Sequence, residues 1–283
     1  MDVPTRFAAA VAGGEVVGHV GGTGPEVLLL HGGPVSEYLE PVADGLRDRY
    51  HVATYQQRGL EPSTLAGPYD VGTHLADVVA VLDELGWRRA IVAGHSWGGN
   101  LLLHLLASHA DRVRGALVID PLGGVGDGGY AAFEAELIRR TPPEEIARGA
   151  ALDERLMTGD ATADEAVESL RIFWPAYFPS PDRAAPFPDL RVSPSMVALT
   201  LTSAIAELPT LEPRLRGLTV PTVFVHGERS PVPLSASRDT ADVIGVVAEV
   251  QVVPGAGHFV WLDAPGCVGA ALDQLARRAI VEP

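Results

Sequence analysis

Short, mainly apolar runs recur towards both ends of the chain, and each stops at a polar or glycine-rich turn. Six of these runs lie at residues 27–30, 52–55, 90–93, 116–119, 223–225 and 250–253. Apolar runs of this length are typical of strands buried on both faces, as in a parallel sheet. The first twenty residues instead predict an antiparallel hairpin at the sheet edge, turning at Gly13-Gly14.

The segments between these runs have helical periodicity. Residues 75–85 place their large apolar side chains on one stripe, which Gly86 ends. Residues 99–109 are apolar nearly all round, as expected of a helix buried against a sheet, and residues 264–280 predict a closing helix. We therefore predict an α/β fold, with a mostly parallel sheet covered by helices on both faces.

This alternation of strand and helix stops between residues 123 and 208. Charged helical stretches at residues 131–140, 143–156 and 163–173 lead there into a proline-rich connector at residues 174–194. The alternation resumes at Leu218. We expect residues 123–208 to form a helical cap, inserted into a core made of residues 1–122 and 209–283.

A candidate nucleophile lies in the sequence GHSWG at residues 94–98, which fits the G-x-S-x-G pattern. It follows a predicted strand and precedes a predicted helix, which is the context of a nucleophile elbow. Such a turn is strained, and its glycines remove side chains that would collide there. We expect Ser96 to be exposed beside the positive end of the helix dipole.

A serine hydroxyl needs a base to accept its proton, and the chain has nine histidines. His258 lies in the sequence GHF directly after the last strand-like run, at the sheet edge where Ser96 also emerges. We expect His258 to be the base. We expect His226 to support a turn, and the side chain of His95 to point away from the nucleophile.

The oxyanion of an acyl-transfer intermediate needs two preorganised N–H donors. The backbone N–H of Trp97, which follows the nucleophile, is one candidate. The loop HGGP at residues 31–34 follows the first predicted parallel strand and supplies the other. Gly33 is the expected donor in that loop, because Pro34 has no N–H.

Charge and composition narrow the classes of partner. The formal net charge of −15 repels nucleic acid and anionic membranes, so we expect a small-molecule substrate instead. All basic residues are arginine, which excludes a lysine nucleophile, and the single Cys267 excludes an intrachain disulfide. No clustered metal-binding histidines or cysteines are present, so we expect neither a metal nor a cofactor. The sequence is compatible with a homodimer.

The chain lacks the sequence features of membrane insertion and secretion. No apolar run is long enough for a membrane-spanning helix. The first residues carry an early acid and no long apolar stretch, unlike a signal peptide. We expect a cytoplasmic protein.

The motifs HGGP (31–34), QRG (57–59), GHSWGG (94–99) and GHF (257–259) resemble those of the α/β-hydrolase superfamily. They are most similar to the branch that contains proline iminopeptidases and related lid-bearing esterases. The resemblance covers both core segments, and the insertion matches the family's helical cap in position. It implies a serine hydrolase that works through an acyl-enzyme.

The acid of the expected triad departs from the family pattern. Most members carry it after the penultimate strand in a pattern like HGxxDxxxP, but residues 226–233 read HGERSPVP, with Ser230 in place of the aspartate. The acid could have moved to Asp120, an arrangement that resembles some lipases and dehalogenases of the superfamily. Glu228 could instead reach over from the usual loop, or the site could lack an acid and be slow or inactive. We favour Asp120 as the acid, and Asp127 is a further, less favoured candidate.

The cap offers one candidate substrate-binding segment, FWPAYF at residues 173–178. We expect Trp174, Tyr177 and Phe178 to wall an apolar acyl pocket, although packing of the cap onto the core would use the same residues. The leading hypothesis is hydrolysis of a small ester, thioester or amide. Gln56 and Val35 replace the Asp and Gly usual in iminopeptidases, so peptide hydrolysis is the second hypothesis. A catalytically inactive small-molecule receptor is the third.

Overall fold

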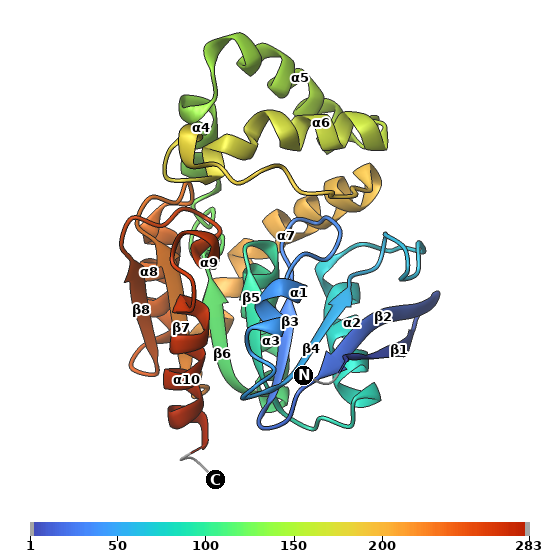
Figure 1. Ribbon diagram of the computed structural model, residues 1–283, viewed down its shortest axis with the longest axis vertical. Coiled ribbons are helices and arrows are strands. Elements are labelled where there is room, and N and C mark those ends of the chain that lie inside the picture. Colours follow the sequence, from blue (N-terminus) through green and yellow to red (C-terminus); the bar gives the residue numbers. More distant parts are fainter. Residues whose placement is uncertain (1–2, 281–283) are drawn as a thin grey trace.

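The computed structural model of the chain describes residues 3–280. Residues 1–2 and 281–283, which fall within the expected core segments, lie outside the described residues. One eight-stranded sheet has the strand order β1-β2-β4-β3-β5-β6-β7-β8 (Figure 1). The strands are β1 (Thr5–Val11), β2 (Gly14–Gly21), β3 (Glu26–Leu30), β4 (His51–Gln56), β5 (Ala90–His95), β6 (Val113–Ile119), β7 (Thr222–Gly227) and β8 (Ala248–Val253).

The sheet is mostly parallel, as the apolar runs predicted. Strands β3 to β8 all pair in parallel. The hairpin of β1 and β2 adds two antiparallel strands at one edge, as predicted, and β2 pairs with β4. In a parallel sheet all carboxyl ends lie on the same side, so the loops that follow β3, β5, β6, β7 and β8 meet along one edge.

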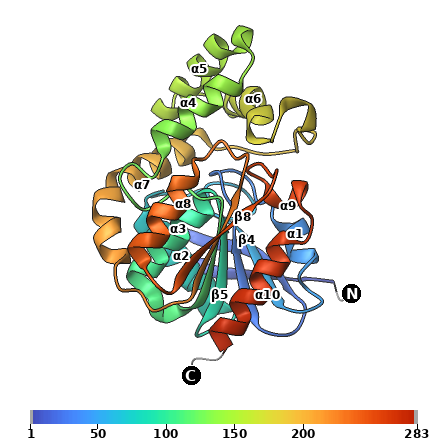
Figure 2. The same cartoon turned by 90° about the vertical axis from the view of Figure 1, so that its left-hand side faces the viewer.

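Helices cover both faces of this sheet. They are α1 (Glu40–Asp44), α2 (Val71–Glu84), α3 (Trp97–His109), α4 (Tyr130–Arg140), α5 (Pro143–Thr158), α6 (Ala163–Phe173), α7 (Pro194–Leu215), α8 (Leu234–Ile244), α9 (Val260–Asp263) and α10 (Cys267–Ile280). Figure 2 shows α2, α3 and α8 on one side of the strands and α1 and α10 on the other.

Alternate strand residues face two separate hydrophobic cores. Leu28 and Val92 pack in the core that contains the buried side chains of α2 and α3. Their neighbours Val27 and Ile91 pack in the core that contains α1 and α10. The period of two along each strand therefore divides the interior into two layers, and β3, β4, β5, β6 and β7 each contribute apolar side chains to both.

The segment without strands, expected as a cap, stands above the carboxyl edge of the sheet (Figure 1). It contains α4, α5, α6, and the 3-10 helices η2 (Trp174–Tyr177) and η3 (Pro181–Arg183). Helix α7 runs through residue 208, where we expected the core to resume, and its Leu211 and Leu215 are buried in the core. It thus links the upper helices to the sheet. Among residues 3–280, no helix is both long and apolar enough to cross a membrane.

Candidate active site

Ser96 occupies the sharp turn between β5 and α3. Its φ of 55° and ψ of −119° form a conformation that residues other than glycine rarely adopt. A Cβ on Gly94 would lie 2.2 Å from the carbonyl oxygen of Gly98, and a Cβ on Gly98 would lie 2.1 Å from that of Leu30. These contacts explain why the GHSWG pattern needs glycine two residues before and two after the serine.

His258 reaches the same edge of the sheet from the loop between β8 and α9. Its side chain is 3% exposed, and Nδ1 lies 3.1 Å from Oδ1 of Asp120. Because a carboxylate only accepts, Nδ1 carries the proton in this pair and Nε2 is left as an acceptor. The backbone N–H of His258 donates to the carbonyl oxygen of Tyr177 at 2.8 Å, which ties this loop to η2.

Asp120 follows β6 directly and is fully buried, with a φ of 44°. Its Oδ2 accepts from the backbone N–H of Gly227 at 2.8 Å, and its Oδ1 accepts from the hydroxyl of Ser230 at 2.6 Å. Ser230, which occupies the family's usual acid position, therefore donates to the aspartate that contacts His258. The serine substitution at residue 230 and the aspartate at residue 120 form one hydrogen-bonded unit.

The other two candidate acids lie elsewhere. Glu228 is exposed, and its Oε2 accepts from the backbone N–H of Gly255 at 2.9 Å. Asp127 accepts from the backbone N–H groups of Gly129 and Ala131, at the start of α4. Of the three carboxylates considered from the sequence, the fold brings only Asp120 to His258.

Burial dominates the electrostatics of this pair. Desolvation lowers the pKa of His258 well below its ordinary value, which keeps the imidazole neutral and able to accept a proton. Desolvation raises the pKa of Asp120 to about 6, against the opposing effects of the nearby His226 and of the hydrogen bonds from Ser230 and Gly227. At neutral pH both groups are in the protonation states that a base and its acid partner require.

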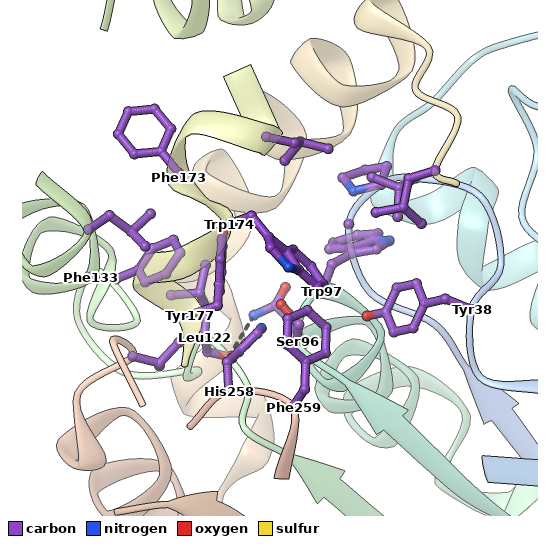
Figure 3. Close-up of a pocket in the computed structure, with 18 of the residues that line it drawn as sticks. Tyr38, Ser96, Trp97, Leu122, Phe133, Phe173, Trp174, Tyr177, His258 and Phe259 are labelled. Carbon is purple, nitrogen blue, oxygen red and sulfur yellow. Dashed lines mark hydrogen bonds between the residues drawn. The ribbon is translucent and has the colours of Figure 1, made fainter. Parts of the chain in front are cut away.

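Ser96 and His258 face one cavity of about 940 Å³ at the junction of the upper helices and the sheet (Figure 3). Within residues 3–280, no hydrogen bond joins Ser96 to the imidazole. Bonds of this kind are often long before substrate binds. Gly33 and Trp97, the two expected oxyanion donors, also line the cavity.

The loop HGGP approaches the serine closely. A Cβ on Gly32 would lie 2.8 Å from the Cβ of Ser96, so this position also requires glycine. The N–H of Gly32 is already used, because it donates to the hydroxyl of Tyr38 at 2.9 Å. That leaves Gly33, whose φ is 111°, as the N–H in this loop that is oriented independently of Tyr38.

A hydrogen-bond chain that the sequence did not reveal connects the loop after β3, the end of β5 and the His258 loop. Tyr38 accepts from Gly32, and its hydroxyl lies 2.6 Å from Nδ1 of His95. Nε2 of His95 lies 3.0 Å from the carbonyl oxygen of His258. Since that carbonyl only accepts, Nε2 of His95 carries the proton and Nδ1 accepts from Tyr38.

We expected the side chain of His95 to point away from the nucleophile, and it does, but the residue also contacts the His258 loop. Its side chain does not line the cavity, yet its ring packs against that of His258 with centroids 4.5 Å apart. The residue is the last of β5, so its side chain projects to the face of the sheet opposite to that of Gly94 and meets the His258 loop there. His226, in contrast, bonds Ser237 and the carbonyl oxygen of Val232, which supports a turn as expected.

The aromatic segment of the cap divides between cavity and core. Trp174 and Tyr177 line the cavity, as expected. Phe178 does not, which corrects our expectation for that residue. Its side chain is 2% exposed and packs against Trp174 and Phe259, because residue 178 lies past the end of η2 and its backbone lies against Gly257.

The motifs HGGP and QRG support each other structurally. Gln57 donates from its side chain to the carbonyl oxygen of His31 at 2.8 Å, and its Oε1 accepts from the indole N–H of Trp97 at 2.9 Å. Arg58 forms a buried ion pair with Asp77, with side-chain exposures of 0% and 2%. The QRG sequence therefore holds the loop that carries Gly33 against the elbow that carries Ser96.

Fold, nucleophile elbow and sheet topology together define an α/β hydrolase. The model of the alpha/beta hydrolase family matches residues 27–270, and the chain belongs to this family.

Its relatives are hydrolases of several kinds. The chain is 28% identical to a putative carbamate hydrolase RutD of Caulobacter sp. (strain K31), over 86% of this chain and 92% of that protein. It is 27% identical to haloalkane dehalogenase 2 of Mycobacterium tuberculosis (strain ATCC 25618 / H37Rv), over 89% and 87% respectively. A solved structure of a thermophilic esterase from Thermogutta terrifontis has the same fold, with a TM-score of 0.68 at 20% identity over 98% of this chain and 99% of that chain.

Proposed function

We propose that this protein is a serine hydrolase of carboxylic esters, with Ser96 as nucleophile, His258 as general base and Asp120 as the acid of the triad. One observation carries the proposal. Ser96, held in a strained elbow, shares a cavity with His258, whose Nδ1 lies 3.1 Å from the buried Asp120.

The proposed reaction transfers the acyl group first to Ser96 and then to water. Ser96 Oγ attacks the ester carbonyl carbon while Nε2 of His258 takes its proton. The N–H groups of Gly33 and Trp97 bind the oxyanion. The imidazolium then protonates the departing alkoxide, and the neutral imidazole activates the water that releases the acid and restores Ser96.

Asp120 has two tasks in this scheme. It holds the tautomer in which Nδ1 of His258 carries a proton, and it stabilises the imidazolium that forms during each half-reaction. The hydrogen bonds from Ser230 and Gly227 keep the carboxylate in place. The helices of residues 123–208 serve as a lid in this proposal, with Trp174 and Tyr177 as part of the substrate-binding wall.

A fluorophosphonate probe tests the nucleophile directly, because it reacts covalently with activated serines. We expect one equivalent to label the protein, and mass spectrometry to place it on Ser96. Ser96→Ala should abolish labelling and reduce ester hydrolysis by about 10⁶-fold. The matched control Ser108→Ala, remote on α3, should label normally. A wild-type protein that resists labelling would favour the inactive receptor.

A substrate panel tests the reaction class. We expect p-nitrophenyl esters to be cleaved with a larger kcat/KM than proline p-nitroanilide. The reverse order would support N-terminal peptide hydrolysis instead.

A further inference from the structure

The cavity extends over the carboxyl edge of the sheet, from the side of one sheet face to the side of the other. At one end it is lined by Leu201, Ala204, Ile205 and Leu208 of α7, which we call the α7 arm. At the other end it is lined by Val42, Leu46 and Val268 beside α1 and α10, which we call the α1 arm. Helix α7 packs on α3, and α1 and α10 cover the opposite face of the sheet (Figure 2).

Ser96 lies between the two arms, because the elbow stands at the carboxyl end of β5, on the sheet edge that separates α7 from α1 and α10. An ester whose carbonyl carbon meets Ser96 must extend its acyl part to one side and its alcohol part to the other. Both arms have apolar walls, so each half of the substrate would leave water for an apolar surface.

Within residues 3–280, and apart from the N–H groups that would hold the oxyanion, the cavity wall carries no free lysine or arginine to pair with a negative charge. Arg49 is the only arginine among the lining residues of the described chain, no lysine lies there, and Arg49 is already engaged by Asp273 and Asp48. Four carboxylates line the cavity as well: Asp127, Glu134, Asp153 and Glu154. A substrate carboxylate would lose its hydration here, gain no cation, and approach charges of its own sign.

We propose that the substrates of this site are uncharged esters that carry a bulky apolar group on each side of the carbonyl, and that esters bearing a carboxylate are excluded. The inference rests on the proposed function, because it places the ester carbonyl at Ser96.

The exclusion of carboxylate-bearing esters is tested with two esters of nearly the same size that differ in charge. p-Nitrophenyl methyl adipate is neutral, whereas p-nitrophenyl hydrogen adipate carries a carboxylate at the same distance from the carbonyl. At pH 8 we expect kcat/KM to be about 100-fold larger for the neutral ester, as unpaired burial of an ion is costly. Equal rates, or faster cleavage of the anion, would overturn the proposal.

Charge variants separate a local effect from the field of the whole protein. Glu134→Gln combined with Asp153→Asn removes two lining charges. This double variant should reduce the ratio of kcat/KM for the neutral ester to kcat/KM for the anionic ester by about tenfold. Glu144→Gln combined with Asp164→Asn removes two exposed cap charges outside the lining. This control changes the net charge equally and should leave the ratio unaltered. If both pairs narrowed the ratio alike, the cavity wall would not be its source.

Two bulky substitutions test the arms. Ile205→Trp should obstruct the α7 arm and Val42→Trp the α1 arm, at positions that are not fully buried. In the wild-type protein, kcat/KM should rise along a series of p-nitrophenyl acyl chains and along a series of butyrate esters of larger alcohols. Each variant should abolish the rise of kcat/KM along one of the two series, and the two variants should affect different series. If both flatten the same series, or neither flattens one, a two-armed cavity is wrong.

The fluorophosphonate probe distinguishes this inference from the proposed function. If Ser96 is labelled but charged and neutral esters react alike, only the substrate class is wrong. If Ser96 is labelled and only the carboxylate-bearing ester is cleaved, the substrate class is again wrong, whereas cleavage of neither ester would mean that the ester reaction of the proposed function is wrong as well. If Ser96 is not labelled in the folded protein, both proposals are wrong.

Discussion

Asp120 makes the contact with His258 that the family motif assigns to residue 230, where this chain has a serine. The aspartate contacts Nδ1 of His258, and the serine donates to that aspartate at 2.6 Å. A hydroxyl cannot stabilise an imidazolium as a carboxylate does, but it can orient and stabilise a buried carboxylate. The two positions must therefore be interpreted together.

Substitution of the two candidate acids separates them. Asp120→Asn should reduce kcat by about 10⁴-fold, because the amide no longer stabilises the imidazolium or its tautomer. Glu228→Gln, at an exposed position, should change kcat by less than about twofold. Adding Ser230→Asp to Asp120→Asn should restore part of the activity, because residue 230 contacts the same Oδ1 of Asp120 that faces the imidazole. Greater loss in the Glu228 variant would refute the assignment.

The pH dependence of kcat/KM should report the ionisation of Asp120. Burial raises the pKa of this carboxyl to about 6, and only its ionised form, present above that pKa, supports His258. Activity on a neutral ester should therefore fall as the pH decreases through about 6. Ser230→Ala removes a hydrogen bond that lowers the pKa, so its acid limb should move to higher pH. A flat profile between pH 5 and 7 would contradict this view.

Tyr38 lines the cavity, and we expect it to act as a positioning residue, because its hydroxyl links the HGGP loop to His258 through His95. Tyr38→Phe removes the acceptor for Gly32 and the donor for His95. We expect kcat to fall about tenfold with KM changed less than about twofold, since the ring remains to pack. Tyr69→Phe, which removes an exposed hydroxyl bonded to Leu65, is the control and should leave both constants unchanged. A change confined to KM would indicate a substrate contact instead.

At the scale of elements, the site is made by strand ends rather than by any one segment. The turn between β5 and α3 supplies Ser96, Asp120 directly follows β6, and the loop after β8 carries His258. Parallel pairing brings these ends together, although Ser96 and His258 are far apart in the chain. The glycines allow the backbones of these loops to approach one another.

The elbow should tolerate no side chain at Gly98. Gly98→Ala would place a Cβ 2.1 Å from the carbonyl oxygen of Leu30, so β3 and α3 must separate. We expect a loss of about 3 kcal/mol or more in the free energy of unfolding, measured by urea denaturation. Gly45→Ala, where the nearest atom is 3.5 Å away and φ is −70°, should change stability by less than about 1 kcal/mol. Similar losses in both variants would contradict the steric argument.

At the scale of the molecule, one buried ion pair joins the catalytic edge to the sheet's N-terminal hairpin. Arg58 pairs with Asp77 of α2 and also donates to the carbonyl oxygens of Ala12 and Ala66. These contacts connect the QRG loop, the β1–β2 turn and α2. Removing one charge would leave the other buried without a partner.

Two aspartates of α2 test this contribution. Asp77→Asn should lower the free energy of unfolding by about 3–5 kcal/mol, because Arg58 stays buried and charged. Asp83→Asn breaks the pair with Arg112, whose aspartate is 66% exposed, and should cost less than about 1 kcal/mol. Thermal and urea unfolding would measure both. Equal losses would mean that the Arg58 pair contributes no more than a surface pair.

The sequence by itself determined the layered α/β fold and the elbow, and it made Ser96 and His258 the candidates for nucleophile and base. Apolar runs and glycine positions are local patterns, and they depend on burial and on backbone sterics that each segment carries with it.

Tertiary structure decided which carboxylate meets His258, that Phe178 belongs to the packing behind the cavity, and that Tyr38 and His95 connect the loop after β3 to the His258 loop. These outcomes depend on the relative positions of loops separated by many residues, and no local pattern encodes those positions. The charged lining and the two arms of the cavity also depend on tertiary structure, because they arise only where the upper helices meet the sheet edge.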